Sequence, residues 1–372
     1  MPRDYDLLGA DAKSAVANGL VTEDWYRTHL DRKTMKALMK RADQPAIWDT
    51  VVLFGSMIAF AGAAIALMPS WWSVPFWLSY GVLYGSAMDS RWHECGHGTA
   101  FKTRWMNRAV YQVACFCMIR DPHCWKFSHA RHHSDTVIVG RDPEVAIMRP
   151  VVVVRMAANL VGLTDMWDGL KRMIRHTGGR ILPDEADYMD PVFFAKTIRT
   201  ARVWIVIYAA TLAAALLLQS WIPVLLIGLP RLYGCWHMVL CGWLQHGGLA
   251  DNVLDHRLNS RTVYLNPISR FIYWNMNYHV EHHMFPLVPT TSFLTCTRPA
   301  SSISPHRTRR SSTPIPRCCP HSGASAKTPI FTSGANCRTP QTPITMAPQG
   351  PQPETKGEKN GRLGRRLRNR RH

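Results

Sequence analysis

Cysteine is scarce in this sequence. Ten cysteines in 372 residues are too few for a scaffold held together by disulfides, and we expect no cleavable signal at the start of the chain. Several cysteines lie in or near apolar stretches, where a reduced thiol packs as a small apolar side chain. These are Cys95, Cys115, Cys117, Cys124, Cys235 and Cys241. The composition therefore excludes a small secreted disulfide-rich protein.

Acidic residues are also few, with 25 against 44 Lys and Arg, but the imbalance is local. Residues 290–372 hold 15 of the basic residues and 2 of the acids, which gives this segment +13 of the net charge of +19. The segment is rich in Pro, Ser and Arg and lacks apolar periodicity, so we predict a disordered basic tail. A nucleic-acid partner is therefore not expected. The composition has two explanations, a reading frame shifted near Pro289 or a natural tail attracted to anionic lipid.

Charge is missing altogether from long stretches of the chain. Residues 51–68 and 71–88 are two uncharged runs of 18, separated by Pro69 and Ser70, and residues 203–230 are an uncharged run of 28 broken near Gln219. Residues 232–244 continue this run after Arg231, a charge that must snorkel, pair with an acid or lie where the helix leaves the lipid. A helix needs about 20 apolar residues to cross a bilayer. We predict an all-α integral membrane protein with about four transmembrane helices in two hairpins and a cytosolic, histidine-rich helical cap.

Basic residues are distributed unevenly between the two sides of these hairpins. The expected far-side turns, 69–70 and 219–220, contain no Lys or Arg, whereas residues 1–46 and 91–202 are rich in both. The positive-inside rule then places both termini and the middle segment in the cytoplasm. We therefore divide the chain into a cytosolic leader (1–46), a membrane domain (47–289) and the tail (290–372).

Three histidine clusters lie on the predicted cytoplasmic side. They read His93-Glu-Cys-Gly-His97, His129-Ala-Arg-His132-His133 and His279-Val-Glu-His282-His283. On a helix, residues three and four positions apart share one face, so each cluster can direct its imidazoles to one point. Each cluster follows an expected hairpin, so packing the hairpins side by side would bring the clusters together.

Neutral imidazole is a ligand for iron, copper, zinc and nickel. Eight imidazoles are too many for one ion, because a zinc ion takes about four protein ligands, and no cluster has the cysteine pairs of a zinc finger. Two metal ions are therefore expected, and an ion that reacts with O₂ must be redox-active, which favours iron. A histidine-rich metal transporter or sensor is the rival class, but it would need polar residues along spans that carry no charge.

The three histidine boxes, the two apolar hairpins and the context Trp274-Asn-Met-Asn-Tyr-His279 resemble the membrane-bound fatty acid desaturase and hydroxylase superfamily over residues 45–289. The resemblance implies a non-haem di-iron centre held by histidines. It also implies one more ligand before the third box, for which Gln245-His246-Gly-Gly is the matching segment, with His237 as a weaker alternative. The expected metal ligands are His93, His97, His129, His132, His133, His246, His279, His282 and His283, with no further catalytic residue.

The same resemblance implies an O₂-dependent oxidoreductase that introduces a double bond into a long-chain acyl lipid. The alternative is a di-iron hydroxylase or monooxygenase of a hydrocarbon or small molecule, because the chain also resembles bacterial members associated with rhizopine- or rhizobitoxine-type pathways. The implied cofactors are two Fe ions, with O₂ as co-substrate, and the implied partners are membrane lipid and a separate ferredoxin-like electron donor. We expect the protein in the bacterial inner membrane with its active site facing the cytoplasm.

Acids near the boxes are candidates to hold the ligating imidazoles, since a metal-bound histidine usually donates its other N–H to a carboxylate or carbonyl. The candidates are Glu94, Asp121, Asp135, Asp142, Glu144, Asp251 and Glu281. Four tryptophans that flank the boxes are expected either to line a substrate tunnel or to pack at the membrane interface. They are Trp92, Trp125, Trp243 and Trp274.

Overall fold

Helices form all the regular structure of residues 3–296, the part of the chain that the computed structural model describes, and no β-strand occurs among them. The expected all-α class is confirmed. Ordered structure continues past the predicted start of the tail, because Thr290–Cys296 form helix α18 and Phe293 packs with Tyr278 and Val288. The rest of the predicted tail, residues 297–372, lies outside the described residues.

The helices follow one another in three stretches. The first contains α1 (Ala10–Ala17), α2 (Arg32–Leu38), α3 (Gln44–Ala66), α4 (Ser73–Val82), the π-helical turn η1 (Leu83–Ala87) and α5 (Met88–His97). The second contains α6 (Arg104–Met118), α7 (Pro122–Ser134), α8 (Val153–Leu160), α9 (Leu163–Thr177), α10 (Pro183–Tyr188) and the 3₁₀ turn η2 (Pro191–Phe193). The third contains α11 (Phe194–Leu217), α12 (Ile222–Leu226), α13 (Pro230–Gly234), α14 (Trp236–His246), α15 (His256–Asn259), α16 (Pro267–Ile272), α17 (His279–Met284) and α18.

Three helical segments of the described chain are long and apolar enough to cross a membrane. They are Gln44–Ala66, Pro191–Leu217 and Ile222–His246. The first corresponds to α3, the second to η2 with α11, and the third to α12, α13 and α14 in sequence. The protein is therefore a helical membrane protein, and the predicted turns near residues 69–70 and 219–220 fall between consecutive helices.

The fourth expected span differs from the other three. Residues 73–97 are continuously helical through α4, η1 and α5, but this helix is less apolar than the three candidate spans. The physical reason is composition, because Ser79, Tyr80, Tyr84 and Ser86 dilute the apolar residues of this stretch. The prediction of about four spans thus reduces to three clear candidates and one more polar helix that packs against α3.

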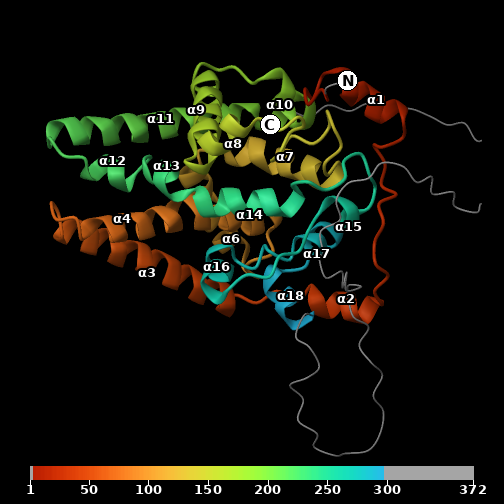
Figure 1. The fold of residues 1–372 in the computed structure, drawn as a ribbon, viewed down its shortest axis with the longest axis horizontal. Coiled ribbons are helices and arrows are strands. Elements are labelled where there is room, and N and C mark those ends of the chain that lie inside the picture. Colours follow the sequence, from red (N-terminus) through yellow and green to blue (C-terminus); the bar gives the residue numbers. More distant parts are fainter. Residues whose placement is uncertain (1–2, 297–372) are drawn as a thin grey trace, which may run out of the picture. The chain divides into compact units, whose positions relative to one another are not determined.

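Helix α13, which follows the second of two helix pairs, meets the first pair at a contact between glycines. Figure 1 shows α3 beside α4, and α11 beside α12, with both pairs extending in the same direction from α7, α15 and α17. A Cβ atom on Gly234 of α13 would overlap the backbone of Gly81 in α4, so the helices approach closely only because both positions lack a side chain. The Ser86 hydroxyl donates to the Gly234 carbonyl at 2.6 Å. This contact fixes the chain after α4 relative to the chain after α13, and both segments lead to histidines.

Arg231, the charge that interrupts the last apolar run, pairs with an acid. Its side chain is 0% exposed, and Nη2 donates to Oδ2 of Asp165 on α9. Nη1 donates to the Gly85 carbonyl at 3.2 Å. Burial opposes ionisation of Asp165, but Arg120 and Arg231 lower the pKa of this carboxyl below its usual value. The ion pair between Arg231 and Asp165 therefore holds α13 against α9.

Candidate metal centre

The histidines lie at helix ends that are set by local sequence. His93 and His97 occupy the last turns of α5, which ends because Gly98 adopts a left-handed conformation with φ of 68°. The second box lies on α7, whose start is capped by Asp121, with its carboxylate accepting from the backbone N–H of His123 and Cys124 at 2.9 Å. The third box forms α17, and His246 is the last residue of α14.

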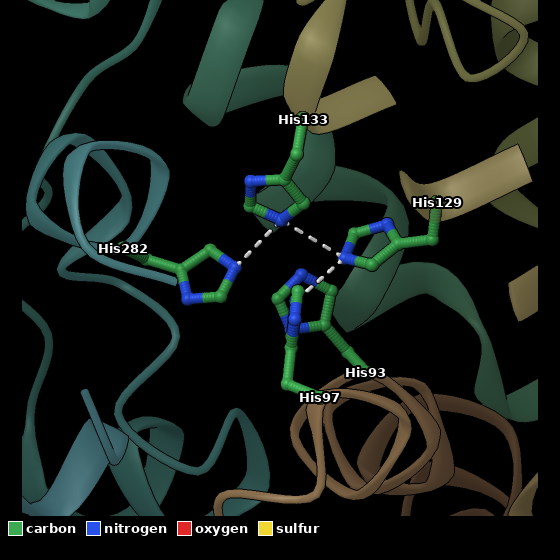
Figure 2. A group of neighbouring side chains, drawn as sticks. All are labelled: His93, His97, His129, His133 and His282. Carbon is green, nitrogen blue, oxygen red and sulfur yellow. Dashed lines mark hydrogen bonds between the residues drawn. The ribbon is translucent and has the colours of Figure 1, made fainter. Parts of the chain in front are cut away.

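One group of five imidazoles combines all three boxes. His93, His97, His129, His133 and His282 each offer a ligand nitrogen, and these atoms lie within 4.8 Å of one another. Figure 2 shows the five rings converging, with Nε2 of His129 3.0 Å from Nε2 of His97 and 3.1 Å from Nε2 of His133. Nε2 of His282 lies 3.0 Å from Nε2 of His133.

A second group of four lies beside the first and contains His132, His246, His279 and His283. Nε2 of His279 is 2.8 Å from Nε2 of His246 and 3.0 Å from Nε2 of His283. The two groups adjoin, because the rings of His133 and His283 are 4.5 Å apart. Helices α7 and α17 contribute to both groups, so the folding of these two short helices assembles the pair.

The hydrogen bonds of the outer ring nitrogens show that this arrangement fits metal ions. Nδ1 of His129 donates to Glu144 at 3.0 Å, and Nδ1 of His132 donates to Asp142 at 2.9 Å. Nδ1 of His246 donates to the Asn259 carbonyl at 2.9 Å. A neutral imidazole carries only one N–H. When that N–H is at Nδ1, Nε2 is unprotonated and its lone pair is available to a metal ion.

The same reasoning applies to His283. Its Nδ1 lies 3.1 Å from the Thr136 hydroxyl, whose one proton is donated to the His132 carbonyl at 2.6 Å, so the hydroxyl accepts from His283. Within each group, the unprotonated Nε2 atoms of neighbouring imidazoles lie close to one another. Lone pairs at such distances repel unless a cation lies between them, and the donor set therefore suits two metal ions.

Burial keeps most of these imidazoles neutral, which is the form that binds metal. Loss of hydration lowers the pKa of each well below the usual value for histidine, and neighbouring imidazoles lower it further. This holds for His93, His97, His133, His279, His282 and His283. His132 is the exception, because Asp142 overcomes the effect of burial and raises the pKa of His132 to about 8.

Every histidine expected from the sequence as a ligand lies in one of the two groups, and His237 lies in neither. The His237 ring is instead 6.3 Å from Tyr273. Of the seven candidate acids, Asp142 and Glu144 hold imidazoles. The others have different partners, and Asp135, for example, pairs with Arg141 at 3.1 Å.

Sequence reasoning missed Thr136 and Asn259, which hold His283 and His246. No signal marked Asn259, since it acts through its backbone carbonyl. Sequence reasoning also missed His256. This buried histidine stacks on Trp25 with ring centroids 4.4 Å apart, and its ring lies 5.1 Å from that of His283.

A cavity of about 440 Å³ opens onto both histidine groups. Three of the four flanking tryptophans line it, namely Trp92, Trp125 and Trp243, whereas the Trp274 indole donates to Asp49 at 2.8 Å. Arg120 also lines the cavity, 4.1 Å from the Trp125 ring and 2.9 Å from Asp89. The space beside the imidazoles is therefore bordered by aromatic rings and by charges that are already paired.

The family model for fatty acid desaturases matches residues 69–307 of this chain, which include all the histidines of both groups. The chain belongs to the fatty acid desaturase family. It is accordingly an oxidoreductase of a metal-dependent family, and the two histidine groups are sites that could hold the metal.

Individual desaturases are similar at low identity. An omega-6 fatty acid desaturase of the endoplasmic reticulum from Glycine max is 25% identical over 272 residues, covering 63% of this chain and 68% of the relative. An acyl-lipid omega-3 desaturase (cytochrome b5) of the endoplasmic reticulum from Arabidopsis thaliana is 24% identical over 273 residues, covering 66% and 69%. An sn-1 acyl-lipid omega-3 desaturase (ferredoxin) from Synechocystis is 32% identical over 87 residues, covering 23% and 24%.

Proposed function

We propose that this desaturase uses two iron ions and O₂ to introduce a double bond into a long-chain acyl lipid. The observation that carries the proposal is the pair of adjoining groups of imidazoles, nine in all, of which five, drawn from both groups, line one cavity. The relatives named above act on acyl lipids or fatty acids, which supports a lipid substrate for this chain.

The proposed ligands divide between the two ions. His93, His97, His129, His133 and His282 would hold one iron, and His132, His246, His279 and His283 the other. A bound iron pair with O₂ would supply the oxidising power to remove two hydrogens from unactivated carbons, which side chains alone do not have. The protein's own contribution is to hold the imidazoles in place and to shape the substrate space.

Two carboxylates carry out much of that positioning. Glu144 and Asp142 accept the outer N–H of His129 and His132, which fixes both rings with Nε2 directed inward. Trp92 packs edge-on against the His129 ring at 5.1 Å and also lines the cavity. Its indole covers one side of the imidazole and forms part of the wall next to which a substrate carbon would lie.

Hydroxylation of a hydrocarbon or small molecule is a second candidate, favoured by the mixed character of the cavity wall. Asp89, Arg120, Glu144 and Gln245 border the same space as the tryptophans. A compact substrate with polar groups would meet polar side chains there, of which Asp89 and Arg120 already pair with each other. Both reactions begin with abstraction of one hydrogen, so the products must distinguish them.

Electrons would come from a separate ferredoxin-like donor, as the relatives' names indicate ferredoxin or cytochrome b5. The basic residues of 1–46 and 91–202 favour a site on the cytoplasmic side of the membrane, which we propose to be the bacterial inner membrane.

The test combines lipid analysis with iron analysis. His93→Ala, His132→Ala and His283→Ala are each expected to lower bound iron and abolish product, because each removes one proposed ligand. His123→Ala on α7 is the matched control, since this histidine lies in neither group and packs near Phe193 at 5.7 Å. Mass spectrometry of lipids from expressing cells should show a new double bond. A hydroxylated product would favour the second candidate, and the ligand variants retaining normal iron and turnover would refute the assignment.

A further inference from the structure

Helix α8 has an apolar face that no other described part of the chain covers. Val153 and Val154 are 73% and 79% exposed, and Ala157 and Val161 are exposed on the same side of the helix. These positions recur at intervals of three or four residues, which places them in one stripe. An exposed apolar stripe of this kind on a protein with membrane spans fits a lipid surface.

The next helix, α9, repeats the pattern. Leu163, Trp167 and Ile174 are exposed and fall on one face, with Lys171 and Arg175 exposed beside them. Figure 1 shows α9 lying across α11 rather than alongside it, and the two helices are in contact. An apolar face with tryptophan and flanking basic residues is typical of a helix that lies in the bilayer surface and meets anionic lipid head groups.

Helix α14 shows the same division between an outer and an inner side. Trp236, Leu240 and Leu244 are exposed at intervals of four residues along one face. Val239, Gly242 and Trp243, on the adjacent face, line the cavity next to the histidines. Because α14 ends one of the candidate spans, its exposed face continues the surface that the bilayer covers.

The inner sides of α8 and α14 form part of the cavity wall. Val152 immediately before α8, and Met156 and Asn159 on α8, line the same 440 Å³ cavity as the α14 residues, and α8 and α14 are in contact. The two elements that border the reaction space are thus elements that also expose apolar faces. The larger adjoining cavity, of about 640 Å³, shares Asp168 and Arg172 with this one, but no histidine of either group lines it.

We propose that α8 and α14 form a portal through which the acyl chain of a membrane lipid enters the cavity sideways from the bilayer, with α8 and α9 lying in the bilayer surface. This inference rests on the proposed function for its substrate. It adds the route, the side of entry and the residues that border it. Val152, Met156, Val239 and Gly242 form the apolar border on the inner side.

Gly242 provides a direct test. A Cβ added there meets no atom within 4 Å, so a side chain at this position would extend into open space on the cavity side without a clash at its base. Gly242→Phe should therefore fold and bind iron as the unaltered protein does, yet obstruct the portal. Gly62→Phe is the matched control, because a Cβ added at Gly62 on α3 likewise meets nothing within 4 Å, and Gly62 is exposed and does not line the cavity.

The measurement uses the full-length, iron-loaded protein in phosphatidylcholine vesicles that contain a lipid with a diazirine in its acyl chain. After illumination, mass spectrometry identifies the labelled residues. We expect label on the cavity-lining residues Met156 of α8 and Val239 of α14 in the unaltered protein and in Gly62→Phe, and loss of that inner label together with loss of lipid oxidation in Gly242→Phe. Iron content, measured in parallel, should be the same in all three.

Label confined to α3 and α11, or found in the larger cavity but absent from α8 and α14, would overturn the portal. Unchanged labelling and turnover in Gly242→Phe would overturn it as well. Failure of the proposed function gives a different result, since the unaltered protein would then oxidise no acyl lipid. The labelling pattern decides the lipid-facing portal in either case, because it does not require turnover.

Discussion

Replacing Asp142 by Asn should damage the metal centre more than the analogous change at Glu144. The Asp142 side chain is 0% exposed, and both of its oxygens lie 2.9 Å from Nδ1 of His132. Oδ1 also accepts from the backbone N–H of Glu144 at 2.8 Å, and Oδ2 from that of Val137 at 2.7 Å. All the neighbours of this carboxylate are therefore donors.

The cost of the substitution follows from that geometry. In either orientation, the NH₂ of the new amide faces a backbone N–H and has no acceptor. An unsatisfied buried donor costs about 1–3 kcal/mol, so the metal-free protein should lose stability of that order. Loss of the carboxylate that orients His132 should also weaken metal binding by about 10–100-fold, the usual effect of removing such a partner.

Glu144→Gln is the matched comparison. Oε2 of Glu144 accepts from His129 at 3.0 Å, and Oε1 accepts from the Ser128 hydroxyl at 2.9 Å. The amide oxygen can still accept from His129, because the Ser128 hydroxyl can rotate and accept from the new NH₂. We therefore expect a smaller loss of stability and of iron at this position.

Purified proteins in detergent would be compared by thermal unfolding after chelation and by iron retained against a graded series of chelator concentrations. Equal losses in the two variants, or a greater loss in Glu144→Gln, would refute the hydrogen-bond reasoning.

Three further predictions concern stability. Asp165→Asn should destabilise the protein by about 3–5 kcal/mol, because Arg231 stays buried without a carboxylate, and Arg231→Met by less, because Asp165 keeps Arg120 at 3.4 Å; thermal unfolding showing the reverse order would contradict this. Burial opposes ionisation of Glu185, but its hydrogen bond to His176 lowers the pKa of Glu185 from 4.5 to about 2. The ionised Glu185 therefore stabilises the folded protein fully above pH 4.5, and this contribution to the free energy of unfolding is lost as the pH falls toward 2. Glu185→Gln should remove that part of the acid dependence in an unfolding titration, and an unchanged profile would count against it. Removing iron should lower the thermal midpoint by an amount that depends on metal concentration, and identical midpoints with and without iron would argue against a bound metal.

Local patterns in the sequence were sufficient for much of the fold. The apolar parts of the helices Gln44–Ala66 and Pro191–Leu217 follow from uncharged runs, because a long apolar stretch has few alternatives in a membrane. The uncharged run of the second helix begins at residue 203, so it did not predict the earlier turns, which carry Lys196, Arg199 and Arg202. The same reasoning treated residues 71–88 like the other spans, although their helix is more polar. A stretch without charge can still be weakly apolar, because tyrosine, serine and glycine carry no charge. Some of these residues make helix contacts, such as that of Gly81 with Gly234.

The fate of Arg231 was open in the sequence because its partner, Asp165, is 66 residues away. Nothing local to either residue indicates the other. Of seven acids near the boxes, two hold imidazoles, and that choice depends on how the loop after α7 folds back over the helix.

The sequence by itself determined which residue types gather and on which helix faces. Spacings of three and four positions orient the imidazoles of each box, and this periodicity is a property of the backbone. The division of the nine histidines was decided only by the tertiary structure. His129 and His133 join one group while His132, between them, joins the other, because the His282 ring of α17 lies 4.7 Å from His133 and the His283 ring lies 4.9 Å from His132. Helical spacing brings neighbours to one face, but the approach of a second helix decides which of them share a centre.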